Sequence, residues 1–403
     1  MLCAFGIYTS ARVGASRLVS DYGVRAAQLP AADLAVRLTP ADPEAHYARA
    51  SVLTDAGALA DARAAYEAAI KLRPSDYVLW LELGKLREQD GDTQGALAAF
   101  REAVERAPFY AEPRWQLGNS YLRLGRTTEA FAELRRAAAR DPSRYPNLID
   151  LAWYASDRDP KLLAANVSPD TSVEHLLVAR FLIRHGAAQA AVEQFRAVGA
   201  ASTETNRRDL VKELLAARSY PEAYALWSEG RTEAHAPGEI TDGGFEQAVR
   251  LDDVGFGWQF ARDTGDAVKF SLDPTMPRAG ARSLRLDFNG NSAPGIELLT
   301  QLVLVEPGAR YRLRCSARTE GLVTGGPLLV HVIAAGPQTD APLADSAPFA
   351  VGTNDWRDTS AEFNVPKDVR AIRLAVARQS CVGGGPCPAF GQVWFDEFKL
   401  EKL

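Results

Sequence analysis

The chain has 403 residues, enough for two or more domains that each bury a core of their own. Hydrophobic residues make up 47% of the sequence and charged residues 24%, which is ordinary for a soluble globular protein. Lys and Arg total 46 against 51 Asp and Glu. This balance gives no electrostatic reason to expect nucleic acid or an anionic membrane surface as a partner.

The first 42 residues form an N-terminal segment with one degenerate repeat. Met1–Tyr8 is apolar, but it is much shorter than the roughly 20 residues that span a bilayer. It also lacks the basic start and the cleavage site of a signal peptide. Two interpretations remain open: a buried first helix, or the remnant of a membrane anchor that begins upstream. Gly23, Ala35 and Pro40 are in phase with the repeats that follow.

A period of 34 residues organises residues 43–144. Segments that begin at Pro43, Tyr77 and Ala111 share small residues at positions 8 and 20, Gly at 15, a bulky residue at 24 and Pro at 32. Small residues let two antiparallel helices approach closely, Gly ends the first helix, and Pro stops the second. The pattern resembles the tetratricopeptide repeat, which implies an all-α solenoid of helical hairpins that binds a protein partner.

In the family that the repeats resemble, the first helix of each hairpin lines a concave binding face. Counting along these helices predicts a protein-binding groove, in which Trp115 is a natural aromatic anchor unless it packs against the next repeat. The Lys and Asn clamp with which some relatives hold a terminal carboxylate is mostly missing. The predicted groove residues are Tyr47, Ser51, Glu82, Lys85, Trp115, Gln116, Asn119 and Arg123.

Weaker helical repeats are expected over residues 145–230, with starts near Ser172 and Glu204. A polar linker with Gly and Pro follows at 231–240. The period then changes to two: apolar side chains alternate with arginines over Arg310–Arg318. Short runs of this kind, separated by turn residues, predict an all-β antiparallel sandwich over 241–403.

Five motifs support the prediction for the C-terminal domain: Asp242–Glu246, Gly255–Trp258, Gly280–Leu286, Val305–Tyr311 and Val393–Asp396. In this order they resemble the galactose-binding-like jelly rolls that include many carbohydrate-binding modules. That resemblance implies a structural Ca²⁺ held by Glu246 and Asp396, with Asp242 as a further donor. The alternative is that these acids cap turns or accept buried hydrogen bonds.

Sugar binding in such modules uses aromatic side chains, because the apolar face of a pyranose ring stacks on a π-surface. The predicted carbohydrate-binding residues are Trp258, Phe260, Trp356 and Trp394. Trp258 ranks first, because it lies between loop glycines and a short strand. The alternative for each Trp is a place in the core of the sandwich.

The positions of the cysteines give information about the cellular compartment of the protein. Cys381 and Cys387 flank a Val-Gly-Gly-Gly-Pro loop, so we expect a disulfide between them if the protein is exported. Cys3 and Cys315 are isolated in the sequence.

No catalytic motif is recognisable around the five histidines, and no phosphate-binding loop is present in the sequence. We therefore expect a non-enzymatic scaffold of the bacterial cell envelope, periplasmic or membrane-anchored, with a cytoplasmic location as the alternative. The repeats would bind protein and the jelly roll a polysaccharide during assembly or export. A protein-only adaptor with a structural sandwich, and an unrecognised polysaccharide hydrolase, are the competing hypotheses.

Overall fold

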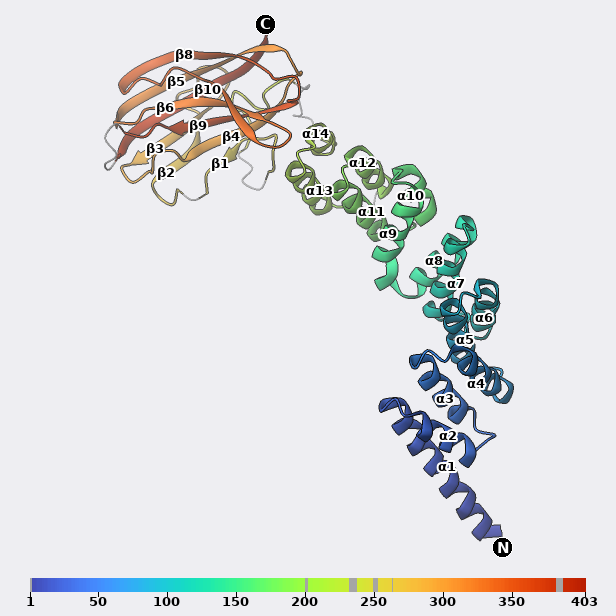
Figure 1. The fold of residues 1–403 in the computed structure, drawn as a ribbon. Helices are drawn as coiled ribbons and strands as arrows, with labels where there is room; N and C mark the ends of the chain where they lie inside the picture. Colours follow the sequence, from blue (N-terminus) through green and yellow to red (C-terminus); the bar gives the residue numbers. More distant parts are fainter. Residues whose placement is uncertain (1, 200–201, 232–237, 249–252, 263, 382–386) are drawn as a thin grey trace. The chain divides into compact units, whose positions relative to one another are not determined.

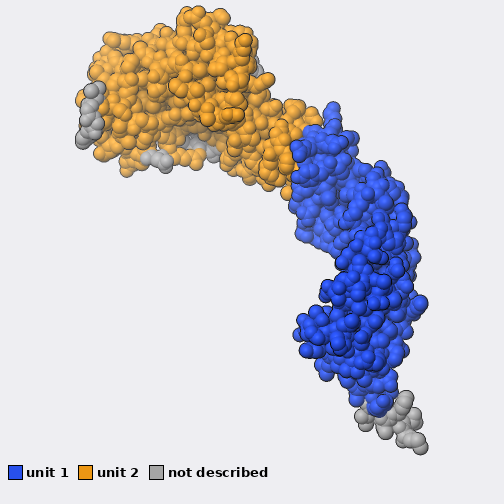
Figure 2. Space-filling model, in the orientation of Figure 1, with its two compact units in different colours: residues 1–170 blue, residues 171–403 orange. Residues whose placement is uncertain are grey.

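The computed structural model describes residues 2–199, 202–231, 238–248, 253–262, 264–381 and 387–403, with side chains from Tyr8 onward. The chain divides into two compact units, Met1–Asp170 and Thr171–Leu403 (Figure 2). The predicted linker lies in the second unit, and its residues 232–237 fall outside the described part.

The first unit consists of helices paired into successive hairpins (Figure 1). The three predicted repeats start at the first residues of α3, α5 and α7. A further, shorter hairpin, α9–α10, lies in the region where weaker helical repeats are expected, before the predicted repeat start near Ser172. The helices are α1 (Leu2–Arg25), α2 (Leu29–Leu38), α3 (Pro43–Asp55), α4 (Leu59–Leu72), α5 (Tyr77–Gln89), α6 (Thr93–Arg106), α7 (Ala111–Arg123), α8 (Thr127–Arg140), the 3₁₀ turn η1 (Pro142–Arg144), α9 (Tyr145–Ala155) and α10 (Pro160–Val167).

The small residues of the repeat pattern lie where the helices of a hairpin come closest. A Cβ built on Gly84 would lie 2.5 Å from Cε1 of Phe100, and one on Gly118 would lie 2.6 Å from Cγ of Leu134. The helix starts are capped by side chains: Asp42 and Asp76 accept hydrogen bonds from backbone N–H groups in the first turns of α3 and α5. The first helix of each clear repeat ends before a glycine with positive φ.

The second unit begins with two more hairpins, whose first helices start at the predicted residues. The Thr171 side chain and Glu174 form a capping box at the start of α11. The helices are α11 (Ser172–Arg184), α12 (Ala188–Ala197), α13 (Glu204–Ala216) and α14 (Tyr220–Ser228).

The rest of the second unit is a sandwich of two antiparallel five-stranded sheets (Figure 1). Sheet A has the order β1-β4-β9-β6-β7, and sheet B has the order β2-β3-β10-β5-β8. One continuous apolar core contains buried residues from both sheets. The strands are β1 (Gln259–Phe260), β2 (Val268–Asp273), β3 (Ser283–Asn289), β4 (Glu297–Leu304), β5 (Arg310–Thr324), β6 (Leu328–Ala335), β7 (Asp340–Asp345), β8 (Gly352–Asn364), β9 (Ala371–Arg378) and β10 (Ala389–Lys402).

The last helical hairpin contacts the sandwich directly. Phe256 lies against Tyr224 and Trp227 of α14, with ring centroids 5.0 and 5.7 Å apart. Asp253 accepts a hydrogen bond of 2.8 Å from Nε1 of Trp227, and it forms an ion pair with Arg231. The α13–α14 hairpin and the sandwich therefore share one packed interface within the second unit.

None of the helices in the described part of the chain is both long enough and apolar enough to cross a membrane.

Candidate binding sites

The predicted groove residues lie on α3, α5 and α7, the first helices of three consecutive hairpins. Arg123 is exposed, and the other seven are partly exposed: Tyr47, Ser51, Glu82, Lys85, Trp115, Gln116 and Asn119. All eight side chains therefore keep surface that a partner can reach.

Electrostatic interactions connect these side chains within α5 and between α3 and α5. Nζ of Lys85 lies 2.9 Å from Oε1 of Glu82. Burial raises the pKa of Tyr47, and the negative charge of Glu82 on the next repeat raises it further. The predicted residues of α3 and α5 thus face one another across the repeat boundary.

Trp115 has a cationic neighbour that the sequence did not reveal. The guanidinium carbon of Arg144 lies 5.4 Å from the Trp115 ring centroid, a cation–π contact. Arg144 also binds Glu112 at 2.8 Å, and Gln116 donates to the same carboxylate at 2.9 Å. Burial opposes ionisation of Glu112, but these hydrogen bonds outweigh it, so the pKa of Glu112 is lowered.

A cluster of polar side chains connects α5 with α7 next to the predicted groove residues. Arg123 and Ser120 both donate to the Glu88 carboxylate. Glu88, Glu112 and Arg144 were missed in the sequence, because charged residues on a helix are usually solvated. The signal that could have found them is position: Glu88 follows Lys85 by three residues on the same helix, and Glu112 precedes Gln116 by four.

Trp258 was the first choice as a sugar platform, and the structure corrects this prediction. Its side chain is only 7% exposed. The ring stacks on Phe245 at 5.3 Å and meets Phe398 at 5.0 Å, and Nε1 donates to the carbonyl of Asp242. With its faces packed inside the sandwich core, Trp258 cannot stack on a sugar.

Of two further predicted platforms, Trp394 is buried and Phe260 is partly exposed. Trp394 is 2% exposed, with Arg285 and Arg318 lying 5.4 and 5.8 Å from its ring centroid and Asp273 accepting from Nε1. Phe260 packs against the core and against Phe270. Trp394 is therefore covered by guanidinium groups, whereas Phe260 belongs to the rim of the core.

The outer face of sheet B retains exposed aromatic surface. Trp356 on β8 is partly exposed, and strand alternation places it on the same face as Asp358, which bonds to Ser316 of β5. Phe390 on β10 is 49% exposed and pairs in register with Val323, another exposed apolar residue. The sequence analysis missed Phe390, because an aromatic at the start of a strand is more often buried.

The predicted metal-binding acids do not form a three-carboxylate group. Among the described residues, no cluster of three or more His, Cys, Asp or Glu is arranged to hold a metal ion. Asp242 instead caps its own turn, accepting from the backbone N–H groups of Glu246 and Gln247. Asp242 therefore has the turn-capping role that was the alternative, and it lines the same hollow as Glu246 and Asp396, so its role as a further calcium donor stays a prediction.

Glu246 and Asp396 still flank one hollow, next to Gly244. Asp396 is fully buried and accepts hydrogen bonds from three backbone N–H groups, those of Arg278, Ala279 and Glu397. Burial raises the pKa of Asp396. Oε1 of Glu246 accepts from the backbone of Ala281. A buried carboxylate beside a second one suits a hard cation, so these two residues would be its carboxylate donors.

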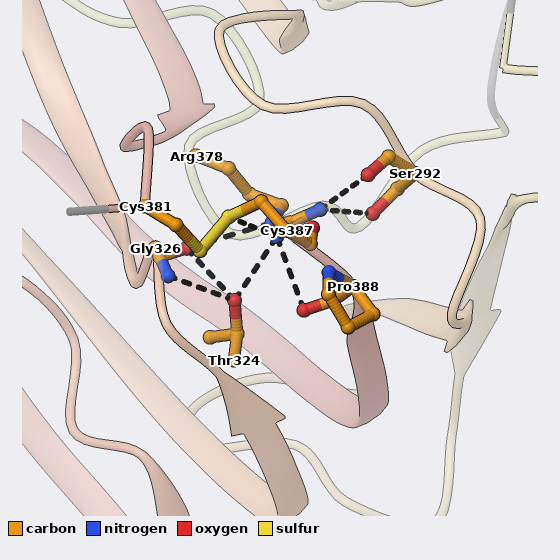
Figure 3. Close-up of a disulfide and its surroundings, with 7 residues drawn as sticks. All are labelled: Ser292, Thr324, Gly326, Arg378, Cys381, Cys387 and Pro388. Carbon is orange, nitrogen blue, oxygen red and sulfur yellow. Dashed lines mark hydrogen bonds between the residues drawn. A yellow bond between two sulfur atoms is a disulfide. The ribbon is translucent and has the colours of Figure 1, made fainter. Parts of the chain in front are cut away.

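Cys381 and Cys387 are joined in a disulfide, with Cα atoms 5.6 Å apart (Figure 3). Cys315 is a buried free thiol. Next to the disulfide lies Arg378, which is 1% exposed. Its guanidinium donates to the backbone carbonyls of Ser292, Cys387 and Pro388 and to Oγ1 of Thr324 (Figure 3). Arg378 therefore connects three segments of the sandwich by hydrogen bonds, and these bonds stabilise the fold.

Two sequence models of the tetratricopeptide repeat match the chain, over residues 43–86 and 81–145. Residues 43–145 are tetratricopeptide repeats. Among solved structures, "MamA 41-end from Desulfovibrio magneticus RS-1" is 19% identical, with a TM-score of 0.32. The match covers 46% of this chain and 93% of that one.

Two further solved structures that match the chain contain carbohydrate-binding modules. A Clostridium thermocellum xylanase fragment, described as CBM22-1–GH10 modules complexed with xylohexaose, is 17% identical with a TM-score of 0.29. That match covers 41% of this chain and 29% of the xylanase chain. A structure described as "CBM4 structure and function" is 9% identical with a TM-score of 0.31, covering 41% of this chain and 99% of its own. The search of curated proteins found no match.

Proposed function

We propose that the protein is a non-enzymatic adaptor whose repeats bind an extended segment of a protein partner. The observation that carries this proposal is the continuous polar and aromatic face formed by α3, α5 and α7. Tyr47, the Glu82–Lys85 pair and Trp115 follow one another across three repeats, and all remain accessible. Backbone groups of an extended chain can pair with the charged residues, while Trp115 offers an apolar anchor.

The groove is tested by substituting its anchor. Trp115→Ala should weaken partner capture by about tenfold or more, since aromatic hot spots commonly contribute at least 2 kcal/mol. Tyr154, an exposed aromatic elsewhere in the first unit, gives the matched control Tyr154→Ala. Equal partner recovery by both variants in pull-down experiments, with unchanged folding by circular dichroism, would show that the groove is not the binding face.

We further propose that the sandwich binds a polysaccharide through the outer face of sheet B. The exposed Phe390 and the partly exposed Trp356 supply aromatic surface there, and arginines and acids on the same face supply hydrogen-bonding groups. Between them, β5 extends from Arg318 to Val323, about 16 Å at the usual rise per residue of a strand. An extended glycan chain can cover such a distance, whereas a single sugar cannot.

Isothermal titration of the whole chain against a panel of polysaccharides tests this surface. Trp356→Ala and Phe390→Ala should each reduce the affinity, while Tyr154→Ala in the repeats should not. Absence of glycan binding by the folded protein would favour the alternative of a protein-only adaptor. The burial of Trp258 and Trp394 supports that alternative, because it gives both residues a structural role.

A place in the bacterial cell envelope, in the assembly or export of polysaccharide, is the setting that fits these two activities together. The Cys381–Cys387 disulfide supports it, since disulfides persist in oxidising compartments. Turnover of a polysaccharide by the purified chain would instead support the hydrolase hypothesis.

A further inference from the structure

The groove contains a cavity at its N-terminal end, between α1 and α3. It has a volume of about 470 Å³, and its walls come from both helices. The sequence analysis placed Tyr47 in the groove but assigned no binding residue to α1. The lining residues are Arg17, Ser20, Asp21, Val24, Glu44, Tyr47 and Ala48.

The charges in this cavity are not matched. Asp21 pairs with Arg25 at 2.9 Å, and Glu44 pairs at 2.7 Å with Arg73, a guanidinium that it shares with Asp76 at 3.4 Å. Arg17 forms no ion pair with any residue that the structure describes. Arg17, an exposed residue of α1, is therefore the charged lining residue that has no ion-pair partner in the described part of the chain.

Two hydroxyl groups that line the cavity, one on α1 and one on α3, also make no hydrogen bond with the described residues. Oγ of Ser20 is shielded from water and makes no hydrogen bond with the described residues, and burying a hydroxyl in this state is unfavourable. The Tyr47 ring packs edge-on against Tyr66, and its hydroxyl makes no hydrogen bond within the described part of the chain. A ligand group that accepts hydrogen bonds would satisfy donors from α1 and α3 together.

We propose that this cavity receives an acidic side chain of the extended partner segment. A carboxylate accepts a charge-assisted, bidentate pair of hydrogen bonds from Arg17 and further bonds from the two hydroxyls. The methyl groups of Val24 and Ala48 pack beside the methylenes of the ligand. The inference rests on the proposed function, because it names the residue type that the groove selects at one position.

An internal side chain fits this site better than the end of a chain. The face with Tyr47 continues across Glu82 and Lys85 to Trp115, while α1 extends on the other side of Arg17. A segment can therefore pass through the cavity and run on in both directions.

Selection from a library of random, capped dodecapeptides by the full-length protein tests the inference. We expect the selected peptides to be enriched in Asp or Glu at one fixed position. Selection with the Arg17→Gln variant should lose that enrichment, while Arg12→Gln, an exposed arginine of the same helix outside the cavity, should keep it.

A double-mutant cycle on one selected peptide then measures the contact. Replacing its acidic residue by the amide should weaken binding to the wild type about tenfold and leave binding to Arg17→Gln unchanged. Ser20→Ala should lower the affinity without lowering the melting temperature, because it removes a hydroxyl that has no partner. Amidation of the peptide's C-terminus should change nothing.

The outcomes separate this inference from the proposed function. Peptides that bind through Trp115 but show no acidic preference, or the same preference with Arg17→Gln, overturn the inference and leave the groove in place. A preference for Lys or Arg, or for a free C-terminus, also overturns it. If the folded protein selects no peptide at all, both proposals fail.

Discussion

Gly118 shows at the scale of one residue why the repeat needs small side chains. An added Cβ would lie 2.6 Å from Leu134 and 3.1 Å from the carbonyl of Ala130. Gly118→Ala should therefore destabilise the first unit by about 1–3 kcal/mol, since overpacking forces neighbours to shift. Gly14→Ala is the control, because no atom lies within 4 Å of its added methyl group. Denaturation in urea compares the two; Gly14→Ala should be neutral or stabilising by up to about 1 kcal/mol.

Glu112 makes the first unit sensitive to acid. Its pKa is lowered in the folded state, because hydrogen bonds from Gln116 and Arg144 outweigh the effect of burial. Its contribution to stability is complete above the pKa of the unfolded chain and disappears as the pH falls through the folded-state pKa. We expect Glu112→Gln to flatten the loss of stability below about pH 4.3.

Melting curves between neutral and acidic pH measure this effect. Glu105→Gln is the control, since Glu105 is exposed and forms no ion pair with the described residues. If Glu112→Gln and Glu105→Gln lose the same amount of stability at acidic pH, Glu112 is not the group that makes the first unit sensitive to acid.

Burial of single aromatic residues was the least predictable part of the candidate site. A Trp beside loop glycines can face solvent or core, and only the packing of Phe245 and Phe398 decides this for Trp258. For Trp394 the deciding contacts come from Arg285 and Arg318 on the two neighbouring strands. Such contacts join residues distant in sequence, so alternation along one strand cannot reveal them.

At the scale of elements, local sequence was a better guide. The starts of α3, α5, α7, α11 and α13 match the predicted residues, because caps, glycines and small residues recur at fixed spacing. Helical repeats were expected over residues 145–230, but no repeat start was predicted before Ser172, because the hairpin α9–α10 keeps the helical pattern and loses the repeat length. Docking of α14 on the sandwich was also missed, because its contacts join two segments with different periodicities.

The contact between α14 and the sandwich gives a prediction for that interface. Asp253 is nearly buried and accepts from both Trp227 and Arg231. Asp253→Ala would leave the Arg231 charge without its partner, which should destabilise the second unit by about 3–5 kcal/mol. Asp355→Ala, which removes an exposed partner of Arg318, should cost at most about 1 kcal/mol. Urea unfolding that ranks the two variants equally would contradict the role of this interface.

At the scale of the whole molecule, the two compact units have separate cores, so calorimetry should resolve more than one unfolding transition. Calcium should raise only the transition of the second unit, because Glu246 and Asp396 lie there. Ligand that binds the folded state alone stabilises it by about 2.7 kcal/mol at a hundredfold excess over Kd. The shift should saturate with calcium concentration, unlike a general effect of salt.

Glu246→Gln isolates this effect, because the amide oxygen can still accept the hydrogen bond from Ala281 while the charge is lost. The variant should fold and keep its melting temperature in chelator, yet respond less to calcium. Glu397→Gln is the matched control: its carboxylate already pairs with Arg278 and Lys399, so the calcium response should persist. Identical melting of the wild type in chelator and in excess calcium would mean that backbone N–H groups alone hold Asp396, and that this sandwich is stable without a metal.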